Sequence, residues 1–299
     1  MGKIFKALEK SGQSFETNYT KSEETGFSSH SDTASQDKEV KEEKKSGYEP
    51  ENIASDKEIP LQESINNDLI LLSKPYSAAS EQFRLLKTNI LFPAKGEPPR
   101  TIMITSPSPE DGKSFVSANL AISIAQSIDE FVLLMDCDLR SPSIHSLFGF
   151  DASQTKGLSD YLSSAMPLSG LLKKTFINKL TILPGGSIPK NPAELLSSDH
   201  MKRLLTEVKL RYADRYILID TPPPYLTSET NAIARYVDGI IIVVRQGKTR
   251  IKEVKDIIDI YGKDKILGVI QNFAKELVGY GYGYRKYGYG YHKDNDDKK

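Results

Sequence analysis

The chain is poor in cysteine, in net charge and in long apolar runs, and each shortage excludes a class of protein. Cys137 is the only cysteine, so no disulfide can form within the chain, and a reducing compartment fits this composition. The 40 basic residues are balanced by 40 acidic residues, which leaves no overall field that would favour nucleic acid or a membrane surface. The sequence also has no apolar run long enough to cross a bilayer.

The first residues lack the usual targeting signals. They contain no apolar core followed by a cleavage site, as a signal peptide requires. MGKIFK does not match the myristoylation pattern, because Lys6 stands where serine or threonine is needed. We therefore expect a soluble protein of the cytoplasm.

Composition divides the chain into four parts. Residues 1–11 are expected to form a short amphipathic helix, with a frayed start of chance periodicity as the alternative. Residues 12–60 are rich in Ser, Glu, Lys, Asp and Thr; they bury too little apolar surface to fold alone, which predicts a disordered linker. Residues 61–278 carry nearly all of the apolar periodicity and are predicted to be the folded domain. Residues 279–299 are predicted to be a flexible, tyrosine-rich tail.

Short apolar runs alternate with helical patterns inside the predicted domain. Strands are predicted at 101–105, 131–136, 180–184, 215–220, 239–244 and 265–272. Helices are predicted at 77–92, 114–126, 197–211 and 249–262, where apolar residues recur at three-to-four spacing. Apolar strands separated by helices indicate an α/β fold, in which a parallel sheet is covered by helices on both faces. Ligands of such sheets bind at the carboxyl ends of the strands.

The first predicted strand runs into half of a phosphate-binding motif. Gly112, Lys113 and Ser114 stand at the start of a predicted helix. There, backbone amides can bind phosphate, the lysine can neutralise it, and the serine hydroxyl can bind Mg²⁺. The front of the loop departs from the Walker A pattern, because Pro107 stands where a glycine is usual. Taken alone, Gly-Lys-Ser more often marks a surface turn than a nucleotide site.

Acidic residues end two further predicted strands. Asp136 and Asp138 are expected to point the same way, because side-chain direction repeats every second residue in an extended segment. Asp220 ends the strand at 215–220. Carboxylates at strand ends suit Mg²⁺ and a base for an incoming hydroxyl, with a solvated junction as the alternative. Together with the loop, they predict a nucleotide–Mg²⁺ site of an ATPase or GTPase, but they do not select the phosphate acceptor.

Four longer segments resemble one family of enzymes. FVLLMDCDLRSPSIHSLFG, PKNPAELLSS, YILIDTPPP and ARYVDGIIIVVRQGKTR are similar to segments of the bacterial tyrosine kinases of capsular and exopolysaccharide synthesis and export. The resemblance covers about residues 75–278 and the tail. It implies a P-loop NTPase fold of the partitioning-ATPase type. It also implies an enzyme that uses ATP and Mg²⁺ to phosphorylate tyrosines in the tail of a neighbouring copy.

The resemblance implies partners as well. They are further copies of the chain in a ring-like oligomer, a membrane protein that controls polysaccharide chain length or export, and a tyrosine phosphatase, with no nucleic acid. The membrane partner would hold the cytoplasmic chain at the inner face of the plasma membrane.

The resemblance also assigns roles to single residues. The nucleotide-binding positions are Asp111, Gly112, Lys113, Ser114 and Phe115, joined by Asn272, which otherwise caps a helix. The catalytic positions are Lys113, Asp136, Asp138 and Asp220, with Asp138 as the base that accepts the phenolic proton. Mg²⁺ ligands are Ser114, Asp136 and Asp220. The phosphoacceptors are Tyr280, Tyr282, Tyr284, Tyr287, Tyr289 and Tyr291. Arg140 either orients the tail or the Asp136–Asp138 loop, or makes a simple surface salt bridge.

The predicted helix at 77–92 carries an assembly motif of the family. Glu81, Arg84 and Lys87 share one helical face. The family uses a Glu-x-x-Arg-x-x-Arg face to assemble rings; Lys87 keeps the charge of the third position but loses the bidentate guanidinium. The alternative is a stripe of ion pairs within the helix.

The phosphate loop contains the clearest departure from the family. Glu110 stands where relatives have a glycine that tolerates unusual backbone angles, and Asp111 adds a second acidic side chain beside it. Carboxylates that face the phosphates would weaken nucleotide binding, so that Glu110→Gly would strengthen it. Carboxylates that face solvent would matter little.

Two other functions compete with a tyrosine autokinase. A partitioning or positioning ATPase switch usually carries a lysine early in the loop, where this chain has Ser108. A nucleotide-binding scaffold with little catalysis is compatible with Glu110. The tail favours the kinase, because glycine-spaced tyrosines can reach a neighbouring site one at a time. The alternative interpretation of the tail is a low-complexity segment that binds partners by ring stacking.

Overall fold

The computed structural model of the chain describes residues 65–164, 166–211, 214–225 and 229–274. The predicted segments 1–11, 12–60 and 279–299 lie outside the described residues, and so do the six tail tyrosines.

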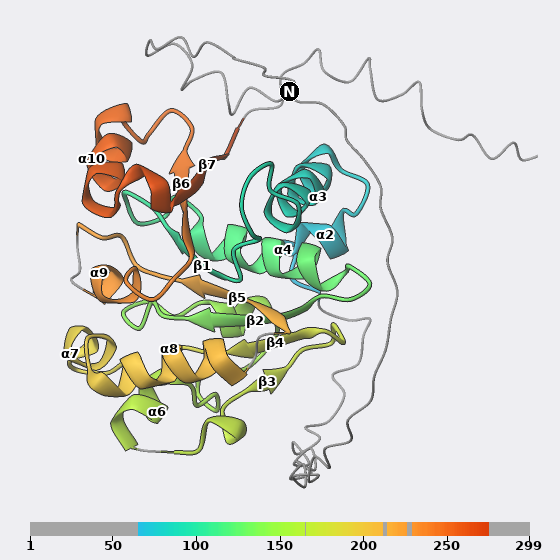
Figure 1. Cartoon of the computed structure of the whole chain (residues 1–299). Helices are drawn as coiled ribbons and strands as arrows, with labels where there is room; N and C mark the ends of the chain where they lie inside the picture. Colours follow the sequence, from blue (N-terminus) through green and yellow to red (C-terminus); the bar gives the residue numbers. More distant parts are fainter. Residues whose placement is uncertain (1–64, 165, 212–213, 226–228, 275–299) are drawn as a thin grey trace, which may run out of the picture. The chain divides into compact units, whose positions relative to one another are not determined.

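The described residues form seven strands, nine α-helices and two 3-10 turns (Figure 1). The strands are β1 (Thr101–Thr105), β2 (Phe131–Asp136), β3 (Lys173–Lys174), β4 (Leu180–Leu183), β5 (Arg215–Asp220), β6 (Gly239–Arg245) and β7 (Ile266–Asn272). The helices are α2 (Ile70–Ser73), α3 (Ala78–Leu91), α4 (Lys113–Ala125), α5 (Ile144–Leu147), α6 (Leu158–Ser164), α7 (Pro192–Leu196), α8 (Asp199–Arg211), α9 (Glu229–Ile233) and α10 (Ile251–Tyr261). The 3-10 turns are η1 (Leu168–Gly170) and η2 (Lys263–Lys265).

All strands lie in one sheet with the order β3-β4-β2-β5-β1-β6-β7. Every neighbouring pair is parallel except β3 and β4. In the centre, β2 and β5 are in a register that pairs Asp136 with Asp220. The two strands therefore end side by side, at the same edge of the sheet.

Alternate residues of each central strand enter two separate cores. On β1, Ile102 and Ile104 pack on one face with α2, α3, α4 and α5, whereas Met103 packs on the other face with helices from α6 to α10. This alternation follows from the pleat of a strand. Because both faces are covered, the strands are apolar throughout, and polar side chains are confined to their ends. The predicted α/β fold with a parallel sheet between two helical layers is confirmed.

The apolar sequence of the central helix α4 follows from its burial in the core. Eleven of its thirteen residues are buried, among them Leu120, Ile122 and Ile124. Such a helix has no polar face for solvent, and its start is therefore fixed against the sheet edge. Lys113 and Ser114, its first residues, are held where β1 ends.

The sequence pattern missed the shortest elements. β3 has two residues, both lysine, and it pairs antiparallel with β4. The helices α6, α7 and α9 have between five and seven residues, too few for an apolar period to stand out. None of the helices in the described ranges is both long and apolar enough to cross a membrane.

Candidate functional site

The loop between β1 and α4 has the backbone of an anion-binding turn. Gly112 caps α4 with φ +91°, and a Cβ atom there would collide with the Nδ2 atom of Asn272. Only glycine fits this position without strain or collision. The first amides of α4 have no acceptor within the helix and point to the edge where β1, β2 and β5 end. Such amides, with the positive end of the helix dipole, can bind phosphate.

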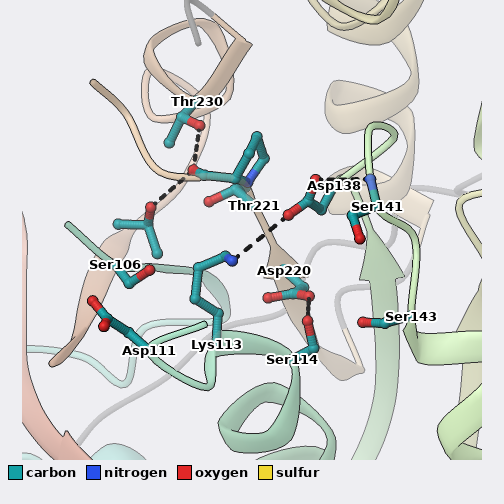
Figure 2. A network of polar contacts seen from close by, with 12 residues as sticks. Ser106, Asp111, Lys113, Ser114, Asp138, Ser141, Ser143, Asp220, Thr221 and Thr230 are labelled. Atoms are coloured by element: carbon teal, nitrogen blue, oxygen red, sulfur yellow. Dashed lines mark hydrogen bonds and ion pairs between the residues drawn. The ribbon is translucent and has the colours of Figure 1, made fainter. Parts of the chain in front are cut away.

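Lys113 and Ser114 turn their side chains toward the carboxylates of this edge (Figure 2). Lys113 is buried, and its Nζ atom lies 3.6 Å from the Oδ2 atom of Asp138. The Ser114 hydroxyl donates to Oδ2 of Asp220 at 2.5 Å, and the Ser117 hydroxyl donates to Oδ1 at 3.2 Å. The start of α4 is thus bonded to the end of β5, as the sequence predicts for a phosphate loop beside a strand-end carboxylate.

Asp136 and Asp220 are two fully buried carboxyl groups at neighbouring strand ends. Burial and the neighbouring Asp220 carboxylate raise the pKa of Asp136 to about 8, although its Oδ2 atom accepts hydrogen bonds from the amides of Ser143 and Ile144. Burial also raises the pKa of Asp220 to about 6, against the opposing effects of Lys113 and the Ser114 hydroxyl. Two crowded carboxyl groups of this kind are unfavourable as a pair of anions without a cation.

Asp138 lies two residues past the end of β2 and just before a turn. β2 ends at Asp136, and the amide of Asp138 donates to Oδ1 of Asp136 at 3.2 Å. The Cys137 amide donates to the Asp220 carbonyl at 2.8 Å, so pairing with β5 continues past the end of β2. The expectation that Asp136 and Asp138 point the same way from an extended segment stays a prediction. The carboxylate of Asp138 still faces the site, where it is paired with Lys113.

The two acidic residues of the loop point in different directions. Glu110 has φ +62°, the glycine-like angle that this position requires, and its side chain is 80% exposed, 3.9 Å from Lys248 Nζ. Asp111 is buried instead; its Oδ2 atom accepts from the Ser108 amide at 3.2 Å and from the Thr249 hydroxyl at 3.4 Å. Burial raises the pKa of Asp111. The Glu110 carboxylate therefore faces solvent rather than the phosphates. The Asp111 carboxylate instead stabilises the loop through its hydrogen bonds with Ser108 and Thr249.

Side chains from the opposite end of the chain support the loop. The Asn272 amide donates to the Asp111 carbonyl at 3.1 Å, and Arg245 Nη1 donates to the Glu110 carbonyl at 3.4 Å. With Thr249, these contacts come from the ends of β6 and β7 and from the segment that precedes α10. Thr249 and Ser117 were not expected at the site, since a hydroxyl 138 or 103 residues away from its partner carries no local sequence signal.

Asn272 and Phe115 both make contacts within the protein. The Asn272 side chain does not cap a helix. Its Nδ2 atom donates to the Asp111 carbonyl in the loop, and its Oδ1 atom accepts from the Phe273 amide. The ring of Phe115 packs into the core against Phe83, 6.0 Å between centroids. The Phe115 side chain is only partly buried. A nucleotide-binding role for these two residues stays a prediction.

Arg140 and the α3 motif lie outside the loop itself. Arg140 donates to the fully buried carboxylate of Glu229, so it does not make a simple surface salt bridge. On α3, Arg84 bonds to Glu81 at 3.1 Å and to the Pro75 carbonyl at 2.7 Å. This is the ion pair within the helix that the alternative expected, and the assembly role of Glu81, Arg84 and Lys87 stays a prediction.

Comparison with known proteins places this site in a family. The ParA family model, described as NUBPL iron-transfer P-loop NTPase, matches residues 99–281. The chain is 35% identical over 222 residues to the tyrosine-protein kinase YwqD of Bacillus subtilis, which covers 74% of this chain and 92% of YwqD. It is 32% identical over 207 residues to the putative tyrosine-protein kinase CapB of Staphylococcus aureus, covering 68% and 88% of the two chains.

Longer relatives and solved structures agree with this placement. The tyrosine-protein kinase Wzc of Salmonella typhimurium is 33% identical over 73% of this chain, but the match spans only 30% of Wzc. The solved kinase domain of the Escherichia coli tyrosine kinase ETK superposes with a TM-score of 0.63 at 30% identity, covering 76% of this chain and 89% of that domain. The chimerical protein CapA2B2 superposes with a TM-score of 0.62 at 31% identity, covering 69% and 89%. The chain therefore belongs to the bacterial tyrosine-protein kinases, which build their site on a P-loop NTPase fold.

Proposed function

We propose that the chain is an ATP-dependent protein-tyrosine kinase that phosphorylates tail tyrosines of a neighbouring copy. The observation that carries this proposal is the convergence, at one sheet edge, of the α4 amides, Lys113, the strand-end carboxylates of Asp136 and Asp220, and the nearby carboxylate of Asp138. Phosphoryl transfer needs little more than such positioning and charge compensation.

The phosphate groups of ATP would lie on the amides at the start of α4, with Lys113 beside them. In the described structure Lys113 is paired with Asp138 at 3.6 Å. A triphosphate is a stronger partner for the ammonium group than a single carboxylate. Nucleotide binding would therefore draw Lys113 toward the phosphates and release Asp138.

The residues at this edge fit a magnesium ion. Two buried carboxyl groups with raised pKa values and the Ser114 hydroxyl supply oxygen ligands of the kind Mg²⁺ prefers. No group of three or more His, Cys, Asp or Glu side chains able to hold a metal is found in the described ranges. Ser114, Asp136 and Asp220 would thus hold the ion jointly with phosphate oxygens and water. When bound, Mg²⁺ neutralises charge on the transferring phosphoryl group.

Asp138 would serve as the base. A free tyrosine has a pKa of about 10, so its hydroxyl needs a proton acceptor at neutral pH. Released from Lys113, the Oδ2 atom of Asp138 would take the phenolic proton as the phenol oxygen bonds to the γ-phosphorus atom and the bond to the β-phosphate oxygen breaks. ADP leaves, and the proton stays on Asp138 until solvent removes it.

The family supports a wider setting for this reaction. Glu81, Arg84 and Lys87 of α3 would contribute to a ring-like homo-oligomer that brings each tail to a neighbouring site. A membrane polysaccharide co-polymerase would recruit the chain to the inner face of the plasma membrane, and a phosphatase would remove the phosphates. In this setting the kinase would regulate capsule or exopolysaccharide synthesis and export.

One assay tests the activity against its alternatives. The full chain is incubated with ATP and Mg²⁺ and probed for phosphotyrosine, beside Lys113→Met and a chain that lacks 279–299. We expect phosphotyrosine in the full chain and in neither control. ATP hydrolysis without phosphotyrosine would favour a partitioning-type switch. If neither ATP hydrolysis nor phosphotyrosine is detected, the result would favour a nucleotide-binding scaffold.

A further inference from the structure

Glu229, the first residue of α9, is a buried acid for which the proposed reaction has no direct use. Its side chain is fully buried. The Oε1 atom accepts both the Nε and the Nη2 hydrogens of Arg140, at 3.2 Å and 3.1 Å. The Oε2 atom is buried and has no hydrogen-bond partner within the part of the chain that the structure describes. Arg140 is thus the one cation that compensates this carboxylate among the described residues.

A pair of this kind holds its arginine firmly. A buried carboxylate that loses its cation is left as an uncompensated charge, so separation of the pair is strongly unfavourable. The Arg140 side chain is 51% exposed, and without Glu229 it would be free to swing into solvent. The Glu229 carboxylate therefore fixes the position of Arg140, although the two residues are 89 positions apart.

Arg140 is part of the turn that presents Asp138. The turn is closed by the Ser141 amide, which donates to the Asp138 carbonyl at 3.1 Å. The same amide donates to the Oδ1 atom of the Asp138 side chain at 3.3 Å (Figure 2). With Oδ1 held by Ser141, the other oxygen of Asp138 faces Lys113. The direction of the proposed base thus depends on the geometry of the turn between Asp138 and Ser141.

We infer that Glu229 is a positioning residue for the kinase reaction, acting through Arg140. By anchoring Arg140, it fixes the turn that directs Asp138 Oδ2 into the site. Glu229 also joins the two segments that follow β2 and β5, because α9 begins only nine residues after the end of β5. This inference rests on the proposed function, in which Asp138 takes the proton of the acceptor tyrosine.

A double-mutant cycle in the full chain tests the inference. The variants are Glu229→Ala, Arg140→Ala and the double substitution, with Glu229→Gln as a variant of the same shape. Glu130→Gln is the matched control, since it breaks the ion pair between Glu130 and Arg100 (2.9 Å), which lies where β1 and β2 begin. For each protein we measure the phosphotyrosine rate at saturating ATP, the Kd for ADP with Mg²⁺, and the melting temperature.

The expected pattern separates positioning from folding. Glu229→Ala lowers the phosphotyrosine rate about tenfold or more through misplacement of the base, while the Kd for ADP changes less than about threefold, because α4 and Lys113 are intact. Glu229→Gln lowers the rate less, with a melting temperature near that of the wild type. The double variant is no slower than Arg140→Ala, since Glu229 acts only through Arg140. Glu130→Gln keeps the wild-type rate.

Other outcomes overturn the inference. An unchanged rate in Glu229→Ala removes any positioning role, and additive losses in the double variant show that Glu229 does not act through Arg140. A rate loss matched by weaker ADP binding and by lower melting in both single variants indicates a merely structural role. If the wild type itself makes no phosphotyrosine, the proposed function fails; the ATP hydrolysis rates of the same proteins then decide the inference by the same pattern.

Discussion

Glu110 shows how a loop can keep its shape after losing a glycine. Its backbone retains the positive φ, and its carboxylate stands in solvent near Lys248. A residue with a side chain in this region carries backbone strain of about 1–2 kcal/mol, whereas an exposed charge is largely screened by salt. Strain, rather than repulsion of the nucleotide, is therefore the main consequence of Glu110.

This geometry sets the outcome of substituting Glu110. At physiological salt, Glu110→Gly and Glu110→Gln are both expected to change the Kd for ATP less than about threefold, because the carboxylate is exposed. Only Glu110→Gly should raise the free energy of unfolding, since it alone relieves the strain of the positive φ angle. The greater conformational entropy of glycine in the unfolded chain limits this increase to about 1 kcal/mol. Calorimetry and thermal unfolding check both. A large affinity gain shared by both variants would mean that the carboxylate faces the phosphates after all.

Asp136 gives the metal-free protein a specific pH dependence. Its pKa in the folded chain is about 8, whereas an unfolded aspartate titrates near pH 4. Because the folded chain holds this proton and the unfolded chain does not, the stabilisation is complete below about pH 4. It is lost as the pH rises to about 8.

The matching measurement is thermal unfolding in EDTA from pH 5.5 to 8.5. The wild type should lose stability relative to Asp136→Asn as the pH rises, by up to about 1.4 kcal/mol per pH unit. Asp136→Asn removes the titrating group but keeps a side chain of the same size. Parallel curves for the two proteins would show that Asp136 is already ionised at neutral pH.

At the scale of elements, β7 acts as a support for the phosphate loop. The Asn272 amide bonds to the Asp111 carbonyl at 3.1 Å and lies against Gly112. Asn272→Ala should weaken ATP binding roughly three- to tenfold, the worth of one hydrogen bond. The affinity of this variant for inorganic triphosphate should fall by the same factor, because the substitution affects the phosphate loop and not the contact with the purine. Gln271→Ala, an exposed neighbour on β7, is the control. Weakening for ATP alone would instead place Asn272 on the purine.

The long elements and their strand ends were predictable because they carry strong periodic signals. Six apolar strands and the helices α3, α4, α8 and α10 were expected within a few residues of their observed bounds. The meeting of Lys113, Asp136 and Asp220 followed from parallel topology, which brings carboxyl ends to one edge. The partners Thr249 and Glu229 did not follow, since tertiary packing alone brings them to Asp111 and Arg140.

At the scale of the whole molecule, the tail is expected to be both substrate and switch. Each phosphate adds about −1.5 to −2 charges, so phosphorylation of the six tail tyrosines would make neighbouring tails repel. Light scattering should therefore report a smaller oligomer after incubation with ATP and Mg²⁺, and an unchanged one for Lys113→Met. A constant mass despite full phosphorylation, verified by mass spectrometry, would separate the tail from assembly.

Mixing two variants that are each inactive alone tests whether phosphate passes from one copy of the chain to another. Lys113→Met with an intact tail supplies only the acceptor, and a chain that lacks 279–299 supplies only the active site. After the two are mixed with ATP and Mg²⁺, mass spectrometry locates phosphate on tyrosine. We expect phosphotyrosine at 280–291 of Lys113→Met in the mixture and in neither protein alone. The wild-type chain, incubated separately, is the positive control for tail phosphorylation. If the wild type carries phosphotyrosine and the mixture does not, transfer between copies is contradicted.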